Sequence, residues 1–429
     1  MSLTSFLLKD SNQIIYYDSE THSLYNQSKE LLSLPPPRDE SWYKSIADTY
    51  GVTHKSESPK IIRILLGQAC NYSCGYCMQK DIGNLHEKPE SFHLETFMTS
   101  VKDNLDLSLI ERVELWGGEP FLYWNDIVPL MKMFDRENLS FFISTNGSPL
   151  VQKHVDFFKT LKARVEMAIS HDGPGQEALR GEDILKRPKK VDILKQLYQL
   201  APKVSFSFNS VLSATNYDLL AINKYFKEFV DNNDIPNTKL TFILIRNYDD
   251  KNSENSAQHV INGKKLTDFG TRLGEYLDKY ILDMKEGKNN FLRSNIVDGP
   301  LGLFDYARNL KTQIPITATS RCGADCSNIL SLDVKGNAKL CPHTHEKFDA
   351  GKLNNIKGIR VTRLDLDRKN EHCYHCPVKR LCKSSCPIKL PDEVFLMNCA
   401  AEKVFYGVRQ LKAFELIFNE KVELLETGL

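Results

Sequence analysis

The chain has 429 residues, of which 41% are hydrophobic and 26% are charged. This composition is typical of a globular protein of two or three domains and excludes a disordered or fibrous chain. Lys and Arg number 56 against 55 Asp and Glu, so the net charge of +1 gives no overall attraction to nucleic acid or an anionic membrane. No apolar run reaches the ~18–20 residues of a membrane-spanning helix. The first residues lack a secretory signal, so we expect a cytoplasmic protein with no nucleic-acid or membrane partner.

We interpret residues 1–58 as a short N-terminal extension. The stretch NQIIYYDSETHSLYNQSKELL, residues 12–32, predicts two strands around a polar turn and then the start of a helix. Pro35, Pro36 and Pro37 would end that helix. Residues 41–51 predict one more short helix, which ends at Gly51.

A regular alternation of strands and helices begins at residue 61. β-Branched, apolar runs predict strands at 61–67, 112–117, 139–147, 163–170, 203–212 and 239–247. Helical periodicity predicts helices at 92–105, 125–134, 151–162, 189–200 and 216–230. Six such units call for a parallel sheet with strands buried on both faces. Because six units are too few for an eight-fold barrel, we expect an α/β fold with an open, partial (β/α)6 barrel over residues 59–250.

The remaining chain divides into three further parts. Residues 251–315 predict a polar loop and bridging helices, and residues 316–400 hold eight of the eleven cysteines in little regular structure. Residues 401–429 have helical apolar spacing and predict a closing C-terminal helix. In a reducing compartment this many cysteines indicate metal or redox chemistry rather than disulfides.

The first cysteine cluster follows the first predicted barrel strand directly. Cys70, Cys74 and Cys77 are spaced C-x3-C-x2-C in GQACNYSCGYCMQK, at the strand end where barrel active sites are built. Three thiolates can hold three irons of a 4Fe–4S cluster and leave the fourth iron open. The alternative is a zinc site completed by a distant ligand, for which His86 is off-pattern, or a set of buried free thiols.

The next strand ends carry small and polar residues. Strand two ends in WGGEP, where Gly117 and Gly118 let a ligand approach the backbone and Glu119 can accept an ammonium. Strand three ends in STNG, with Ser144 and Asn146 suited to hydroxyl groups. Strand four ends in SHDGP, which contains Ser170, Asp172 and Gly173, and Arg180 follows. Each motif alone is a common turn, but four at consecutive strand ends indicate a shared site.

ACNYSCGYC, WGGEP, STNG and SHDGP together resemble the radical S-adenosylmethionine (SAM) enzymes over about residues 60–250. The resemblance implies a 4Fe–4S cluster on Cys70, Cys74 and Cys77, whose open iron takes the amino and carboxylate groups of SAM. One electron then cleaves SAM, and a 5′-deoxyadenosyl radical abstracts a substrate hydrogen. The residues that it implies for SAM binding are Tyr76 at the adenine, Gly117, Gly118 and Glu119 at the amino group, Ser144, Asn146, Ser170 and Arg180 at ribose and carboxylate, and Asn209 and Val211 at the adenosyl pocket.

The eight later cysteines resemble the SPASM extension of radical SAM enzymes, with spacings C-x9-G-x4-C and C-x2-C-x5-C-x3-C. The resemblance implies two auxiliary 4Fe–4S clusters and therefore three clusters in all. The first would be held by Cys322, Cys326, Cys341 and Cys386, and the second by Cys373, Cys376, Cys382 and Cys399. Two zinc-ribbon sites are the alternative, since spacing alone does not separate zinc from iron–sulfur.

SPASM proteins act mostly on peptides, which leaves two reactions open. The first is maturation of a ribosomally made precursor peptide, either by epimerisation or, as we favour, by a side-chain cross-link. The second is anaerobic sulfatase maturation, in which an Asp base follows the cysteine of the G-x4-C motif. Pro342 occupies that position here, with His343 and His345 nearby, so we favour peptide maturation.

The partners implied are a precursor peptide and an electron donor such as flavodoxin or ferredoxin. The N-terminal extension is a candidate for leader-peptide binding by strand addition. A multi-cluster electron carrier or a zinc-binding interaction protein is the alternative of another class, and neither would cleave SAM.

Overall fold

The computed structural model describes residues 3–19, 23–32, 54–79, 94–247, 258–298, 302–312, 324, 326–341, 349–360, 371–374, 376–382 and 390–427. The statements below concern these residues. Among their helices, none is long and apolar enough to cross a bilayer.

A nine-stranded, mostly parallel sheet organises the molecule, in the order β12-β11-β10-β4-β5-β6-β7-β8-β9. Its six consecutive parallel strands are β4 (Ile61–Leu65), β5 (Arg112–Trp116), β6 (Ser140–Thr145), β7 (Arg164–Ser170), β8 (Val204–Leu212) and β9 (Lys239–Leu244). All six predicted strands are confirmed, as is the α/β class. The partial barrel stays a prediction; the strand order itself is open, with β12 and β9 at its ends.

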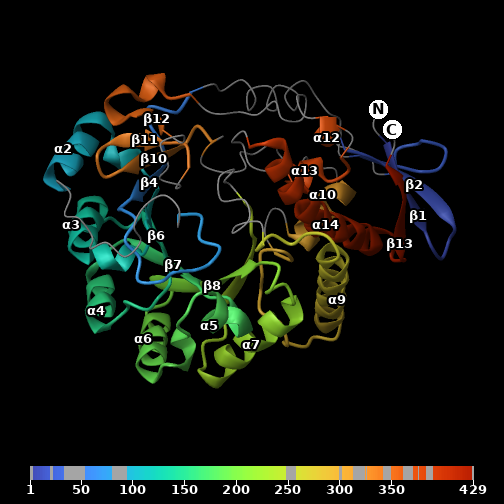
Figure 1. The fold of residues 1–429 in the computed structure, drawn as a ribbon, viewed down its shortest axis with the longest axis horizontal. Coiled ribbons are helices and arrows are strands. Elements are labelled where there is room, and N and C mark those ends of the chain that lie inside the picture. Colours follow the sequence, from blue (N-terminus) through green and yellow to red (C-terminus); the bar gives the residue numbers. More distant parts are fainter. Residues whose placement is uncertain are drawn as a thin grey trace.

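Helices follow the strands along the outer side of the sheet (Figure 1). They are α2 (Leu94–Asn104), α3 (Trp124–Phe134), α4 (Gln152–Thr160), α5 (Gln176–Leu179), α6 (Pro188–Gln199) and α7 (Leu219–Asn232). Local sequence explains two of their starts: Pro188 occupies the first turn of α6, and the Asp218 carboxylate caps α7 by accepting the Ala221 N–H at 3.0 Å. The five predicted helices of this part are confirmed within a few residues.

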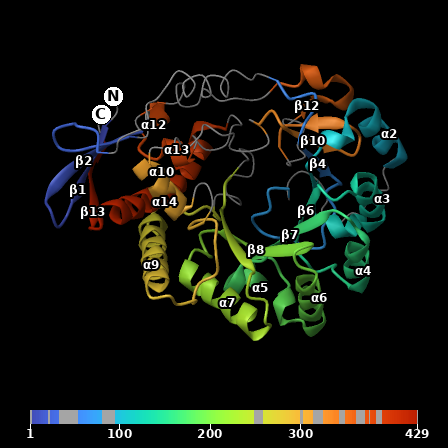
Figure 2. The ribbon, with the colours of Figure 1, turned by 180° about the vertical axis from the view of Figure 1, so that it is seen from behind.

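The two faces of the sheet differ, so the expectation of strands buried on both faces is wrong. The face under the helices is almost fully buried and apolar, with Val113, Leu115, Phe141, Ile143, Val165, Phe206 and Phe208 at most 8% exposed. The alternate positions on β8, such as Ser205, Ser207 and Asn209, are exposed or half-buried. We call this second side the inner face, because both views show the helices on the other side of the curved sheet (Figures 1 and 2).

The cysteine-rich part contributes three strands that its sequence did not predict. β10 (Ile329–Asp333) pairs parallel with β4, and β11 (Asn337–Lys339) and β12 (Asp349–Lys352) extend the sheet antiparallel. These strands are only three to five residues long, which leaves little periodicity to detect.

The chain termini form a second, antiparallel sheet of order β13-β1-β2-β3. Its strands are β1 (Leu3–Leu8), β2 (Gln13–Asp18), β3 (Ser23–Tyr25) and β13 (Val422–Thr427). β2 and β3 were predicted and are confirmed. The expected helix start before residue 32 is wrong, because Tyr25 and Leu31 form a β-bridge, and the helix expected at 41–51 lies outside the described residues.

The C-terminal helix ends earlier than its sequence indicated. α14 (Asp392–Phe418) stops where Asn419 adopts a left-handed conformation with φ of 56°, and the following residues pair with β1 as β13. α14 packs against α9 (Lys265–Lys285) and α10 (Leu303–Thr312), and the short helices α12 (Glu371–Tyr374) and α13 (Lys379–Cys382) lie near it. Phe414 of α14 meets Phe6 of β1 with ring centroids 4.9 Å apart, which joins the terminal sheet to the core.

Candidate active site at the carboxyl ends of the strands

The cysteine loop leaves β4 and is held against the end of β5. The Gly118 N–H donates to the Gly67 carbonyl at 2.9 Å, and the Glu119 N–H donates to the Ala69 carbonyl at 2.8 Å. A Cβ at Gly118 would lie within 3 Å of the backbone oxygens of Gln68 and Ala69, so only glycine permits this approach. The paired glycines of WGGEP therefore position the loop that carries Cys70.

The three thiols of this loop are close enough to influence one another. Burial raises the pKa of Cys70 to about 12, and Cys74 and Cys77 contribute to that rise. Burial also raises the pKa of Cys74, although the Arg180 guanidinium, whose Nη1 lies 3.9 Å from its sulfur, opposes the effect. Buried thiols of this kind ionise when a metal centre supplies positive charge.

Within the described residues, no three Cys, His, Asp or Glu side chains converge on a single point as the ligands of one metal ion would. Cluster thiolates bind different irons and need not share one point, so this observation is compatible with a 4Fe–4S cluster. The loop carries one buried thiol, Cys74, and two partly buried ones, Cys70 and Cys77, which fit three ligands of a cluster with an open iron.

Glu119 is fully buried, and its carboxylate is already occupied by three donors of the protein. Oε1 accepts from the Thr145 hydroxyl at 2.7 Å and the Phe121 N–H at 3.1 Å, and Oε2 accepts the Asn146 N–H at 2.7 Å. Burial raises its pKa to about 7 despite these bonds. In this structure Glu119 joins the ends of β5 and β6; whether it also meets an ammonium stays a proposal.

Asp172, which the sequence analysis placed at a strand end without a role, is the centre of the site. This fully buried carboxylate accepts from the Tyr76 hydroxyl, from Arg180 Nε at 3.0 Å and from the Val211 N–H at 2.9 Å. Arg180 also lies over the Tyr76 ring, 5.3 Å from its centroid. Three residues predicted from different motifs thus meet at one carboxylate.

His171, the residue before Asp172, is held by hydrogen bonds of its own. His171 is fully buried, accepts the Gly173 N–H at Nδ1 and therefore donates from Nε2 to Asp183 at 2.8 Å. Asp183 also accepts from the Tyr225 hydroxyl at 2.6 Å. Burial lowers the pKa of His171, which keeps the ring neutral. The SHDGP motif was the available signal, since it contains two titratable residues beside one turn.

The remaining predicted contacts lie on the inner face near the carboxyl ends. Ser144, Ser170, Asn209 and Val211 occupy alternate, half-buried positions on β6, β7 and β8, and Ser170 pairs with Asn209 in the sheet register. Asn146 differs, because its side chain donates to Asn71 Oδ1 at 2.9 Å and so supports the cysteine loop.

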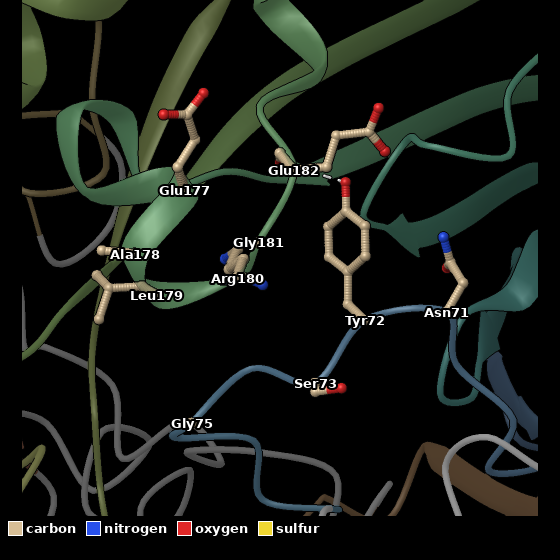
Figure 3. A pocket seen from close by; sticks show the side chains of 10 residues that line it. All are labelled: Asn71, Tyr72, Ser73, Gly75, Glu177, Ala178, Leu179, Arg180, Gly181 and Glu182. Atoms are coloured by element: carbon tan, nitrogen blue, oxygen red, sulfur yellow. Dashed lines mark hydrogen bonds between the residues drawn. The ribbon is translucent and has the colours of Figure 1, made fainter.

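A cavity of about 560 Å³ lies between the cysteine loop and residues 177–182. It is lined by Asn71, Tyr72, Ser73 and Gly75 of the loop and by residues 177–182, and Figure 3 shows Tyr72 reaching across to the Glu182 carbonyl. Arg180, whose Nη1 lies 3.9 Å from the Cys74 sulfur, forms part of its wall.

The later cysteines gather beside α14 where they are described. Cys373, Cys376, Cys382 and Cys399 are at most 8% exposed, and Cys376 and Cys373 help to raise the pKa of Cys399 to about 11, an effect that burial dominates. The Cys382 thiol donates to Glu402 at 2.8 Å, and Glu402 also pairs with Arg246 just beyond β9. Of the other predicted set, Cys326 and Cys341 are described, but Cys322 and Cys386 lie outside the described residues, as do Pro342, His343 and His345.

Comparison with known proteins agrees with this geometry. Residues 64–213, which run from β4 to just beyond β8, match the Radical SAM superfamily. These residues form a radical SAM domain. The radical SAM cyclopropyl synthase TigE of Paramaledivibacter caminithermalis is 26% identical over 251 residues, which are 52% of this chain and 49% of TigE. The match thus spans about half the length of that relative.

Two solved structures share the fold of the radical SAM domain and most of the chain. The sulfatase maturase anSMEcpe, solved with bound AdoMet and the Cp18Cys peptide, has a TM-score of 0.56 at 19% identity, covering 84% of this chain and 99% of that one. Streptococcus suis SuiB, bound to precursor peptide SuiA, has a TM-score of 0.52 at 17% identity, covering 81% and 76%. At these identities the similarity concerns the fold alone.

Proposed function

We propose that the protein is a radical SAM enzyme that modifies a ribosomally made precursor peptide, installing a side-chain cross-link. The observation that carries the proposal is the meeting of the Cys70–Cys77 loop with Tyr76, Arg180 and Val211 around Asp172. A 4Fe–4S cluster with SAM would supply one-electron cleavage and a 5′-deoxyadenosyl radical that abstracts hydrogen. Cys70, Cys74 and Cys77 would hold this cluster.

The chain's own residues would bind and orient SAM. The Asp172 carboxylate holds Tyr76 and Arg180 in place, so that the ring can flank an adenine and the guanidinium stays ionised beside the loop. Ser144, Ser170 and Asn209 offer hydroxyl and amide groups on the inner face for ribose and carboxylate. Glu119 is fixed beside the Gly117–Gly118 backbone by its bonds to Thr145 and Asn146, and the carbonyl oxygens of this backbone would accept the ammonium.

The remaining predictions belong to the same proposal. Two auxiliary 4Fe–4S clusters would use the eight later cysteines, for which the four buried thiols beside α14 give partial support. A flavodoxin or ferredoxin would supply electrons. A leader peptide would add to an edge of the terminal sheet, whose edges are β3 and β13.

A peptide substrate is supported by two neighbours of similar fold. Both SuiB and anSMEcpe were solved with peptides, and the name of TigE denotes a ring-forming radical SAM synthase. Sulfatase maturation remains the second candidate, since anSMEcpe has the fold of this chain over 84% of its length. The base that this reaction needs is replaced in the sequence by Pro342.

Iron counting and SAM cleavage test the proposal. The reconstituted protein should hold about twelve irons, and joint replacement of Cys70, Cys74 and Cys77 by Ala should remove about four and abolish 5′-deoxyadenosine formation. Joint replacement of Cys373 and Cys376 is the matched control, because it should also remove about four irons yet leave SAM cleavage measurable. Loss of a single zinc from the first variant would refute the proposal.

The mass of the peptide products tests the identity of the substrate. Reduced enzyme and SAM should lower the mass of the precursor peptide encoded beside this gene by about 2 Da, for one new bond, and leave a sulfatase peptide unchanged. Formylglycine on the sulfatase peptide, about 18 Da lighter than its cysteine, with the precursor untouched would reverse the assignment.

A further inference from the structure

The inner face of the sheet carries charged side chains at mid-strand, where a closed barrel is filled with aliphatic ones. In the sheet register Arg63 of β4 lies beside Glu114 of β5, and Phe142 of β6 lies between Glu114 and Glu166 of β7. Arg112, two residues before Glu114, shares this face. Charged residues are rarely retained inside a sheet without a partner or a function.

These four charged residues form a connected chain of ion pairs, here called the inner-face ladder. Arg63 Nε lies 2.7 Å from Glu114 Oε2, and Arg112 Nε lies 3.2 Å from Glu114 Oε1. Arg112 Nη1 reaches past β6 to Glu166 Oε2 at 2.8 Å. The ladder therefore spans four adjacent strands.

Aromatic rings support the two arginines. Arg63 lies 5.1 Å from the centroid of Trp116, and Arg112 lies 4.9 Å from the centroid of Phe142. Cation–π contact of this kind holds a guanidinium in one orientation. Both arginines are thus fixed, with side chains only 12% and 24% exposed.

Glu166 is the member of the ladder whose carboxylate can accept a further hydrogen bond. Glu114 accepts from Arg63, Arg112 and the Trp116 indole and is 11% exposed. Glu166 accepts only from Arg112, through Oε2, and its side chain is 41% exposed. Among the described residues nothing donates to Glu166 Oε1, so this oxygen of a half-exposed side chain is available to a further donor.

The ladder lies below the site at the strand ends. Glu166 precedes Ser170 on β7 by four residues, or about 13 Å at the ~3.3 Å rise of a strand. Both positions share the inner face because side chains alternate along a strand. An extended peptide on this face would cover the same distance with about four residues.

We propose that Glu166, held by the inner-face ladder, recognises a Lys or Arg side chain of the peptide substrate. This inference rests on the proposed function for the identity of the substrate. The carboxylate accepts the ammonium or guanidinium at Oε1, while Arg112 and Glu114 keep its orientation. The modified residue then lies about four positions from the basic one in the peptide sequence.

Peptide binding to the unreduced, full-length protein tests the proposal. The probes are three fluorescein-labelled 12-residue peptides of one Gly-Ser-Ala host, with two central residues that are both Lys, both Gln or both Glu. Fluorescence anisotropy should show the Lys peptide binding about ten- to a hundredfold more tightly than the Gln peptide, the range for one charge-assisted contact. Glu166→Gln should abolish this preference. Glu111→Gln is the matched control, since Glu111 pairs with Lys60 at the surface, and it should leave the preference intact.

Each other outcome overturns the proposal. These outcomes are equal binding of the three peptides, no binding by any of them, tighter binding of the Glu peptide, or a Lys preference that survives Glu166→Gln. Formation of 5′-deoxyadenosine by the wild type is measured in parallel. Absence of SAM cleavage in the wild type would refute the proposed function while the charge preference, an equilibrium property, is still measured.

Discussion

Replacing the buried Asp172 by Asn should destabilise the protein far more than the same replacement of an exposed aspartate would. The substitution keeps the shape of the side chain but removes the carboxylate that accepts from Arg180, Tyr76 and the Val211 N–H. The side chain of Arg180 is only 10% exposed, so its charge would remain buried without a counter-ion. Breaking a buried ion pair in this way costs about 3–5 kcal/mol.

The chain offers a matched control in Asp268. This carboxylate also accepts from one tyrosine, Tyr217 at 2.8 Å, and one arginine, Arg272 Nε at 3.1 Å. It is 46% exposed and Arg272 is 39% exposed, so water can replace the lost partner. Asp268→Asn should therefore lower the free energy of unfolding far less than Asp172→Asn.

Urea unfolding of the metal-free protein, followed by circular dichroism, measures both changes. The midpoint should fall markedly for Asp172→Asn and hardly for Asp268→Asn, with the slope unchanged in both. Equal losses below about 1 kcal/mol would show that the buried network around Asp172 contributes no more than a surface pair. That result would refute Asp172 as the centre of the site.

Two further predictions concern the end of β5. Gly118→Ala should lower the free energy of unfolding by about 3 kcal/mol and reduce iron uptake, because its Cβ would meet backbone that cannot move away. Gly274→Ala in α9 is the control, since its Cβ would meet only Val408 at 3.9 Å. In urea unfolding this control should be neutral or stabilising. Burial raises the folded-state pKa of Glu119 to about 7 from the ordinary value of 4.5. The contribution of protonated Glu119 to the free energy of unfolding is therefore complete below about pH 4.5. It is lost as the pH rises through about 7, and the loss is about 3 kcal/mol. Glu119→Gln should abolish this loss, and identical pH profiles for the two metal-free proteins would contradict the burial argument.

Local patterns were enough to predict the six parallel strands and the cysteine loop. Strand and helix periods are properties of neighbouring residues, so IIRILLG and RVELWG indicate strands without knowledge of their partners. The same holds for Cys70, Cys74 and Cys77, whose spacing places three thiols on one turn. Placement after a parallel strand then implied the correct end of the sheet.

Tertiary structure decided what depends on residues far apart in the chain. β1 pairs with β13 across more than 400 residues, and β10 joins β4 across more than 260, distances at which no local period carries information. For the same reason Asp172 could not be distinguished from an ordinary turn residue until Tyr76, Arg180 and Val211 were brought to its carboxylate. The ladder from Arg63 to Glu166 also depends on strand register, since only adjacent strands in that register place opposite charges side by side on one face.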